Sequence, residues 1–137
     1  MKINSYLTFG GNCREAMSFY KNCLGGDLKF QTLADSPQMA GLPNVYKRYI
    51  VHATLIKDNL VLMASDLPSE QSLIKGNAIA LMLHCNSKSE IEEYYEKLSA
   101  GGLKDQPLAR TYWGALAGNL IDKFGNHWML HFQENPE

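Results

Sequence analysis

The chain has 137 residues, of which 45% are hydrophobic and 20% are charged, and its formal net charge is -1. This length and composition suit one compact domain with a buried core. The charge balance lacks the basic excess of a nucleic-acid binder, and no apolar run reaches the roughly 18 residues of a membrane span. We therefore expect neither nucleic acid nor a membrane as a partner.

Two further features indicate the compartment. The cysteines Cys13, Cys23 and Cys85 are odd in number and lack the spacing of a zinc finger or a Cys-x-x-Cys motif. Free thiols of this kind are typical of a reducing compartment. No signal peptide is visible, because polar Asn4 follows Lys2 within two positions. The sequence predicts a cytoplasmic protein.

The first half of the chain predicts a strand, a helix and further strands. Residues 3–9 form the expected first strand, and Cys13–Leu24 carries apolar residues at helical spacing, followed by two glycines. Asn12 followed by Glu15 gives a capping-box pattern at the helix start. Cys13 lies on the apolar stripe of this helix, which predicts an inert thiol.

The connections of the first half are also readable. Asp58-Asn59 is a tight hairpin signal before an apolar strand at residues 60–64. Residues 34–44 contain two prolines and a glycine, and we expect a longer loop there that lies over a cavity mouth. Residues 66–77 are the expected hinge between the two halves of the chain.

The second half repeats the pattern of the first. A strand is predicted at residues 78–83, and a helix at Lys88–Ala100 is again followed by two glycines. Ser87 followed by Glu90 is a second capping-box pattern. The strands at 60–64 and 78–83 are apolar on both faces, but one helix per half covers only one face. The other faces must meet each other, a second chain or a cavity.

The closing segment has the sharpest local pattern. Asp122 and Gly125 bracket a predicted turn, because Asp bonds turn backbone and Gly lacks the Cβ restriction. In the strand that follows, alternate side chains point to opposite faces. One face carries His127, Met129 and His131, and the other carries Trp128, Leu130 and Phe132.

Seven short patterns, in order along nearly the whole chain, resemble the PhnB-like branch of the vicinal oxygen chelate superfamily, which includes glyoxalase I, bleomycin-resistance proteins and ring-cleaving dioxygenases. They are Tyr6-Leu7-Thr8-Phe9-x-Gly11, Glu15-Ala16-x-x-Phe19-Tyr20, Gly25-Gly26, His52-Ala53-x-Leu55, Leu62-Met63-x-Ser65-Asp66, Tyr112-Trp113-Gly114-x-x-x-Gly118 and Asp122-x-Phe124-Gly125-x-x-Trp128. This branch is often labelled 3-demethylubiquinone-9 3-methyltransferase-like. No Gly-x-Gly-x-Gly turn after a strand is present to hold a nucleotide-like methyl donor.

The resemblance implies the architecture. It predicts a mixed α+β fold in which two βαβββ modules, at about residues 1–67 and 78–137, form one eight-stranded vicinal oxygen chelate domain over residues 1–137. It also implies a homodimer with pockets near the subunit contact. Limited proteolysis should therefore not release a stable half at residues 66–77.

The resemblance also implies where a metal would lie. Metal-using relatives supply His, Glu or Gln from the first and last strand of each module. Those places fall on Ser5, Met63, Ala78 and Met129, to within about a residue for Ser5 and Ala78. None is a good ligand for a hard divalent metal. We therefore expect no catalytic metal and no cofactor.

The family strand order brings the inward faces of several segments together, which gives the predicted ligand site. Its members are Phe9, Met63, Ser65, Tyr112, Trp113, Met129 and His131. Methionines adapt their shape, and the aromatic pair offers stacking area. We expect a largely apolar pocket for a small molecule.

The amino-acid sequence is compatible with three functions. The first is a metal-independent small-molecule-binding protein. The second is a lyase, isomerase or dioxygenase that uses a histidine or holds a metal through residues such as His52, His84 or His131. The third is an interaction module whose apolar faces serve only dimerisation. His52 itself is more simply interpreted as a structural histidine than as a general base.

Overall fold

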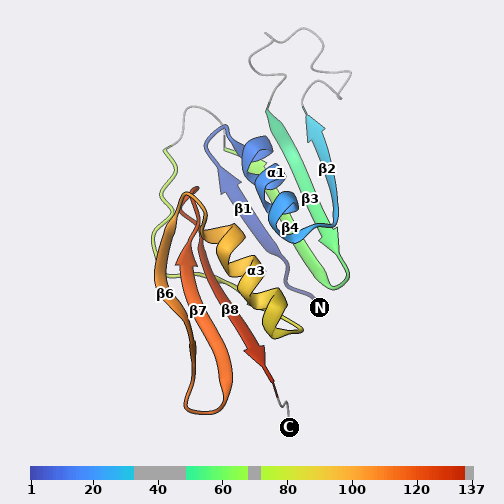
Figure 1. Ribbon diagram of the computed structural model, residues 1–137. Coiled ribbons are helices and arrows are strands. Elements are labelled where there is room, and N and C mark those ends of the chain that lie inside the picture. The colour runs from blue at the N-terminus through green and yellow to red at the C-terminus, as the bar shows by residue number, and fades with distance from the viewer. Residues whose placement is uncertain (33–48, 68–71, 135–137) are drawn as a thin grey trace, which may run out of the picture. The chain divides into compact units, whose positions relative to one another are not determined.

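The computed structural model describes residues 1–32, 49–67 and 72–134. The chain divides into two compact units, residues 1–74 and 75–137. Within the described residues each unit holds a four-stranded sheet with one helix on one face, so the predicted α+β class is confirmed (Figure 1). The loop expected at residues 34–44 lies outside the described part. The single domain and its hinge at 66–77 stay predictions.

Unit 1 has the order strand, helix and three strands. Its elements are β1 (Ser5–Phe9), α1 (Cys13–Leu24), β2 (Asp27–Thr32), β3 (Ile50–Lys57) and β4 (Leu60–Asp66). The sheet order is β1-β4-β3-β2, with β1 parallel to β4 and the other pairs antiparallel. The predicted hairpin turn is confirmed, and Asp58 adopts a positive φ of 51° in it.

Unit 2 repeats this topology. Its elements are β5 (Leu81–His84), α3 (Lys88–Ser99), β6 (Leu103–Arg110), β7 (Ala115–Ile121) and β8 (His127–Gln133). The sheet order is β5-β8-β7-β6, and β5 is parallel to β8. The predicted βαβββ repeat is therefore confirmed, although the strand expected at 78–83 begins only at Leu81.

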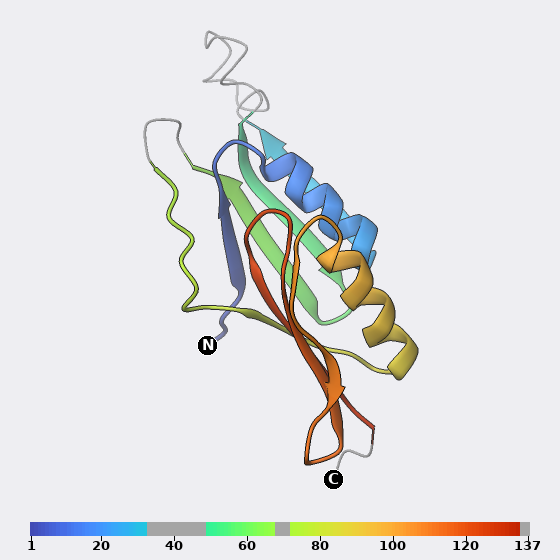
Figure 2. The same ribbon diagram turned by 60° about the vertical axis from the view of Figure 1, so that its left-hand side comes forward.

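Each helix packs on one face of its own sheet, as Figures 1 and 2 show from two directions. The predicted apolar stripe of α1 is confirmed, because its buried residues are Cys13, Ala16, Met17, Tyr20, Cys23 and Leu24. In α3, Ile91, Tyr95 and Leu98 are buried, whereas Tyr94 is only half-buried. The hydroxyl of Tyr95 donates to the carbonyl oxygens of Gln106 and Asn119 at 2.9 and 3.1 Å, which ties the helix to β6 and β7.

The start of α1 differs from the prediction. Asn12 makes no side-chain cap hydrogen bond, so the predicted capping box there is wrong. The carboxylate of Asp66, at the end of β4, takes this place. Its Oδ1 accepts from the backbone N–H groups of Gly11 and Cys13 at 3.1 and 2.9 Å, and its Oδ2 accepts from that of Ile50 at 3.0 Å. One carboxylate thus joins the helix start to β3.

The predicted capping box of α3 is confirmed. The Ser87 hydroxyl accepts from the backbone N–H of Glu90 at 3.1 Å. The Glu90 carboxylate reaches back one residue further than expected and accepts from the N–H of Asn86 at 3.0 Å. Both bonds satisfy backbone donors at the edge of the first turn.

The three cysteines are buried, and none of them forms a disulfide, which agrees with the predicted thiols. Burial raises the pKa of Cys13 to about 12, with a smaller effect of the Asp66 charge, and burial with Glu90 raises the pKa of Cys85 to about 12. We predict that native protein reacts slowly with iodoacetamide up to pH 9, since the thiolate is the nucleophile. Rapid labelling before unfolding would contradict this.

The same shifts predict a pH dependence of stability. A thiol of the unfolded chain ionises near its ordinary pKa of 9.0, whereas the folded thiols stay protonated up to about 12. Because the unfolded state then binds fewer protons, the free energy of unfolding should fall as pH rises above 9. Urea titrations of the wild type and of Cys13→Ala at pH 8 and 10 would measure the contribution.

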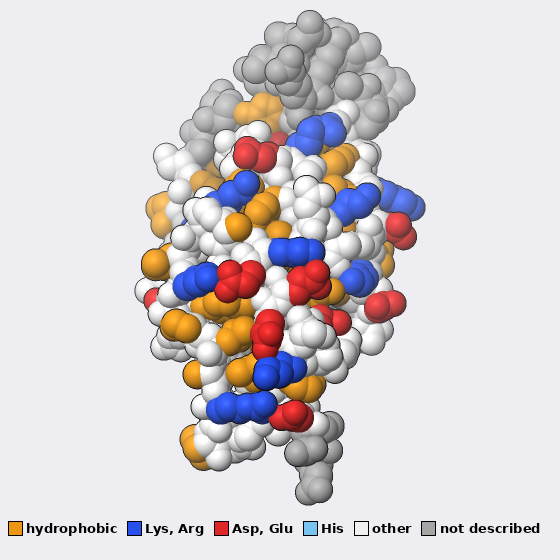
Figure 3. Space-filling model, viewed as in Figure 1, with side chains coloured by type: hydrophobic (Ala, Val, Ile, Leu, Met, Phe, Trp, Pro, Cys, Tyr) orange, Lys and Arg blue, Asp and Glu red, His pale blue; other side chains and the backbone are white. Residues whose placement is uncertain are grey.

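The described helices include none that is long and apolar enough to cross a membrane. On the face shown in Figure 3, basic and acidic side chains are interspersed. The ion pairs of unit 2 include Lys88 with Glu92 and Lys97 with Glu93 along α3. Along α3, acidic and basic side chains therefore pair with one another, which differs from the continuous basic stripe that binds nucleic acid.

Candidate functional site

In each unit, the side of the sheet turned away from the helix is called the open face here. In unit 1, strand register places Tyr6 beside Met63 and Thr8 beside Ser65. Thr54 pairs with Met63 from the other side. Buried Leu62 and Ala64 alternate with these residues and point toward α1. The open face of unit 1 is therefore a mixed polar and apolar surface.

His52 also lies on the open face of unit 1. The Tyr6 hydroxyl is 3.5 Å from its Nδ1, and the Thr54 hydroxyl is 3.2 Å from its Nε2. The Tyr6 and His52 rings are 5.9 Å apart between centroids. Both ring nitrogens of His52 thus have a hydroxyl partner, which agrees with its interpretation as a satisfied structural histidine.

The open face of unit 2 has a different character. His127, Met129 and His131 point to it, while Trp128 and Leu130 are buried under α3, so the predicted alternation along β8 is confirmed. In the adjacent β5, Met82 pairs with Met129, and His84 pairs with His131. Thioethers and imidazoles therefore dominate the part of this face that β5 and β8 form.

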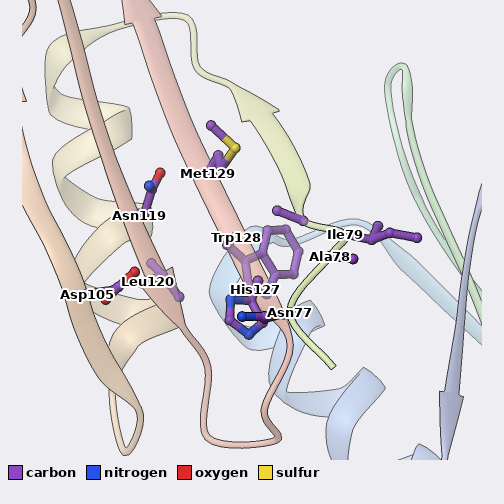
Figure 4. A pocket seen from close by; sticks show the side chains of 10 residues that line it. Asn77, Ala78, Ile79, Asp105, Asn119, Leu120, His127, Trp128 and Met129 are labelled. Atoms are coloured by element: carbon purple, nitrogen blue, oxygen red, sulfur yellow. The ribbon is translucent and has the colours of Figure 1, made fainter. Parts of the chain in front are cut away.

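Unit 2 also contains a hollow of about 360 Å³ at one end of its open face (Figure 4). Its lining residues are Asn77, Ala78, Ile79, Ala80, Asp105, Asn119, Leu120, His127, Trp128 and Met129. In Figure 4, Asp105 and Asn119 lie on one side, Ala78 and Ile79 lie on the opposite side, and the β8 residues lie between them. The Asn119 amide donates to the Gln106 amide oxygen at 2.9 Å, which orients it.

The hollow was only partly visible in the sequence. Met129 is the single predicted site residue that lines it. Asn119 had a usable signal, because it is a polar residue inside the apolar strand β7. Asn77 and Asp105 had no such signal, since they lie in polar stretches that resemble ordinary surface.

The other predicted ligand residues lie in several places. Met63 and Ser65 share the open face of unit 1, and His131 lies on the open face of unit 2. Phe9 is only 1% exposed and alternates with Thr8, so it lies in the core of unit 1 rather than on its open face. That these residues form one ligand site stays a prediction.

The aromatic pair lies between β6 and β7. Tyr112 is almost fully exposed, Trp113 is 54% exposed, and their rings meet edge to face with centroids 4.8 Å apart. This position is several residues along the sheet from the hollow. Such exposure agrees equally with the two roles considered for this pair, which are stacking on a ligand and packing at the rim of a pocket.

Strand register corrects two of the four positions that were expected to correspond to metal ligands. Tyr6 rather than Ser5 lies opposite Met63, and Met82 rather than Ala78 lies opposite Met129, because Ala78 precedes β5. The facing groups are a phenol and three thioethers, which do not fit a hard divalent ion. Within residues 1–32, 49–67 and 72–134, no three His, Cys, Asp or Glu side chains converge on a common point.

Residues 2–130 match the family model of the Glyoxalase/Bleomycin resistance protein/Dioxygenase superfamily. The chain belongs to this superfamily. The resemblance inferred from the seven short patterns is therefore confirmed. The superfamily assignment also agrees with the two βαβββ units and their mixed four-stranded sheets.

Three relatives illustrate the similarity. Protein YjdN of Escherichia coli (strain K12) is 27% identical over 141 residues, covering 96% of this chain and 95% of that protein. The crystal structure of protein PA1353 from Pseudomonas aeruginosa matches with a TM-score of 0.86 and 36% identity, over 98% of this chain and 99% of that one. A putative 3-demethylubiquinone-9 3-methyltransferase, PhnB protein, from Bacillus cereus matches with a TM-score of 0.75 and 24% identity, over 96% and 99%. The last of these supports the fold alone.

Proposed function

We propose that the protein binds an organic small molecule in the hollow of unit 2, without a hard divalent metal. The volume of about 360 Å³ carries this proposal. It lies within the roughly 300–1,000 Å³ typical of ligand pockets. The phenol and thioethers at the facing strand positions favour metal-free binding, because hard ions bind such groups weakly.

The lining suggests the chemistry of the ligand. Ile79 and Met129 offer apolar contact area beside and on β8. Asp105 and Asn119 lie together on one side of the hollow, so they favour a ligand with hydrogen-bond donors on one edge (Figure 4). We expect an apolar body with a polar edge that reaches these two side chains.

The first test is to identify what the purified protein carries. Native mass spectrometry of protein prepared without added ligand, followed by a thermal-shift screen, should give a compound that raises the melting temperature with its concentration. We predict that Asn119→Ala and Ala78→Phe each weaken binding of that compound at least tenfold. The first removes a polar contact and the second fills the hollow.

A control keeps this test specific. Thr54→Ala changes the open face of unit 1 and no lining residue, so the affinity should stay within twofold of the wild type. Equal affinity of the wild type and Ala78→Phe, with both proteins folded, would contradict binding in the hollow. The compound would then bind elsewhere in the chain. A wild type for which neither experiment finds a bound compound would favour the alternative in which apolar faces serve only dimerisation.

Trp113→Ala tests whether the ligand site extends to the aromatic pair. The open face between the hollow and this pair carries the small residues Ala109 and Ala117, which leave room for an elongated ligand. Trp113→Ala should then weaken ligand binding more than it lowers the free energy of unfolding. Trp113 is half exposed, so its loss removes little packing from the core. Loss of stability with unchanged affinity would make Trp113 a packing residue instead.

We also propose that the protein is a homodimer with an isologous contact. Exposed large apolar side chains on the strands of unit 1 support this, among them Tyr6, Val51 and Ile56. Sedimentation velocity should show a dimer at micromolar concentration. A monomer alone at high micromolar concentration would contradict this.

A further inference from the structure

Four potential metal ligands lie next to one another on the open face of unit 2. Met82 and His84 come from β5, and Met129 and His131 come from β8. We call these four residues the Met–His cluster. The strands are adjacent and parallel, and the register pairs the two methionines with each other and the two histidines with each other. All four side chains therefore leave the same face of the sheet.

Strand geometry sets the size of the cluster. Neighbouring strands lie about 4.8 Å apart, and residues two apart along a strand are separated by about 6.6 Å. The four Cα atoms thus mark a small rectangle under one patch of surface. Met side chains have three rotatable bonds, which lets both thioethers reach a point above its centre.

The two imidazoles are spaced to share one ion. Their ring centroids are 5.5 Å apart, with an interplanar angle of 73°. A metal–nitrogen bond of about 2.0 Å, with roughly 1.1 Å from nitrogen to centroid, allows a centroid separation of up to about 6.2 Å for two rings on one ion. The observed spacing of His84 and His131 falls within that limit.

The exposure of the methionines is the second observation. Met82 is 50% exposed and Met129 is 40% exposed, whereas methionine more often fills a core. Thioether sulfur is a soft ligand that selects Cu(I), and imidazole also binds copper well. All four groups are uncharged ligands, which suits an ion of single positive charge.

We propose that the Met–His cluster binds one Cu(I) ion through the imidazoles of His84 and His131 and the thioethers of Met82 and Met129. The site is independent of the small-molecule function proposed above, although Met129 also lines the hollow. Cys85 follows His84 but alternates to the buried side of the sheet. It is therefore not a ligand in this arrangement.

The test is an anaerobic titration of the whole chain against a chromophoric Cu(I) chelator. The wild type should take one Cu(I) per chain, and X-ray absorption should show both sulfur and imidazole ligands. His84→Asn and His131→Asn should each weaken Cu(I) binding at least tenfold. Met82→Leu and Met129→Leu, which keep side-chain volume, should weaken it severalfold or more.

Matched controls separate the cluster from other soft ligands. Met63→Leu removes a methionine from the open face of unit 1, and Cys85→Ala removes the neighbouring thiol, so both should bind Cu(I) like the wild type. Circular dichroism and thermal melts without copper establish that each variant is folded. Met82→Leu leaves the lining of the hollow intact, so small-molecule binding should survive in it.

Three results would overturn the proposal. The first is the absence of stoichiometric Cu(I) binding by the wild type. The second is wild-type Cu(I) affinity in a folded double variant His84→Asn with His131→Asn, or loss of binding in Cys85→Ala. The third is Zn(II) binding as tight as Cu(I) and unchanged by Met82→Leu with Met129→Leu, which would indicate an ordinary histidine pair.

Discussion

Replacing Asp122 by Ala should lower the free energy of unfolding by about 3 kcal/mol. Asp122 is 2% exposed, and one carboxylate serves three donors after β7. Its Oδ1 accepts from the backbone N–H groups of Phe124 and Asn126 at 2.9 and 3.0 Å. Its Oδ2 accepts from the indole N–H of Trp128 at 2.8 Å, and that bond is buried.

The size of the effect follows from what the substitution leaves behind. Ala removes the acceptor but not the donors, and a buried donor without a partner costs about 1–3 kcal/mol. The Trp128 indole is itself 2% exposed, so water does not replace the lost acceptor there. The turn that aligns β8 with β7 would lose its two side-chain bonds at the same time.

Urea denaturation of Asp122→Ala, Asp122→Asn and Asp105→Ala would measure this effect. Asn keeps the shape of Asp but replaces one acceptor oxygen with a donor. The free energy of unfolding of Asp122→Asn should therefore lie between that of the wild type and that of Asp122→Ala. Asp105 is exposed in the same unit, and its substitution should change stability by less than about 0.5 kcal/mol. Equal stabilities of Asp105→Ala and Asp122→Ala would show that the network contributes little.

Replacing Gly102 by Ala should cost at least about 2 kcal/mol, because the new methyl group has no room. A Cβ at this position would lie 2.1 Å from the carbonyl oxygen of Ile121 and 2.8 Å from the carbonyl carbon of Asp122. Both atoms belong to backbone, so no flexible side chain can move aside. The chain from α3 to β6 passes too close to the end of β7 for any side chain.

The corresponding glycine of unit 1 has the same role. A Cβ on Gly26 would lie 2.6 Å from the carbonyl oxygen of Ile56, and its φ of +99° also disfavours a side chain. Gly10→Ala is the matched control, since no atom lies within 4 Å of its Cβ position and no restricted φ is found there. Thermal melts that showed Gly102→Ala and Gly10→Ala to be equally stable would contradict the close approach.

The two predictions should also be coupled. A Cβ on Gly102 would press on the backbone of Asp122, whose carboxylate organises the turn into β8. Substitutions that share a contact are not additive in their effects on stability. The double variant should therefore lose less free energy of unfolding than the sum of Gly102→Ala and Asp122→Ala, because a displaced Asp122 has already lost part of its network.

The sequence alone determined the features that depend on near neighbours in the chain. Apolar spacing located α1 to the residue, and the Ser87–Glu90 pair located the start of α3. Alternation assigned His127, Met129 and His131 to one face of β8. The repeat then indicated two copies of one topology. Each of these rests on contacts between residues a few positions apart, whose spacing is written directly in the chain.

Only the tertiary structure decided which distant residues meet. Asp66, rather than Asn12, accepts the hydrogen bond at the start of α1. It does so from Cys13, which is 53 positions away in the chain, and no local pattern can indicate such a contact. Pairing of β1 with β4 decided that Tyr6, not Ser5, faces outward beside Met63. A shift of one residue turns every side chain of a strand to the opposite face, so face assignment depends on a partner strand far away in sequence. The hollow has the same origin, because its walls come from segments that only the sheet of unit 2 brings together.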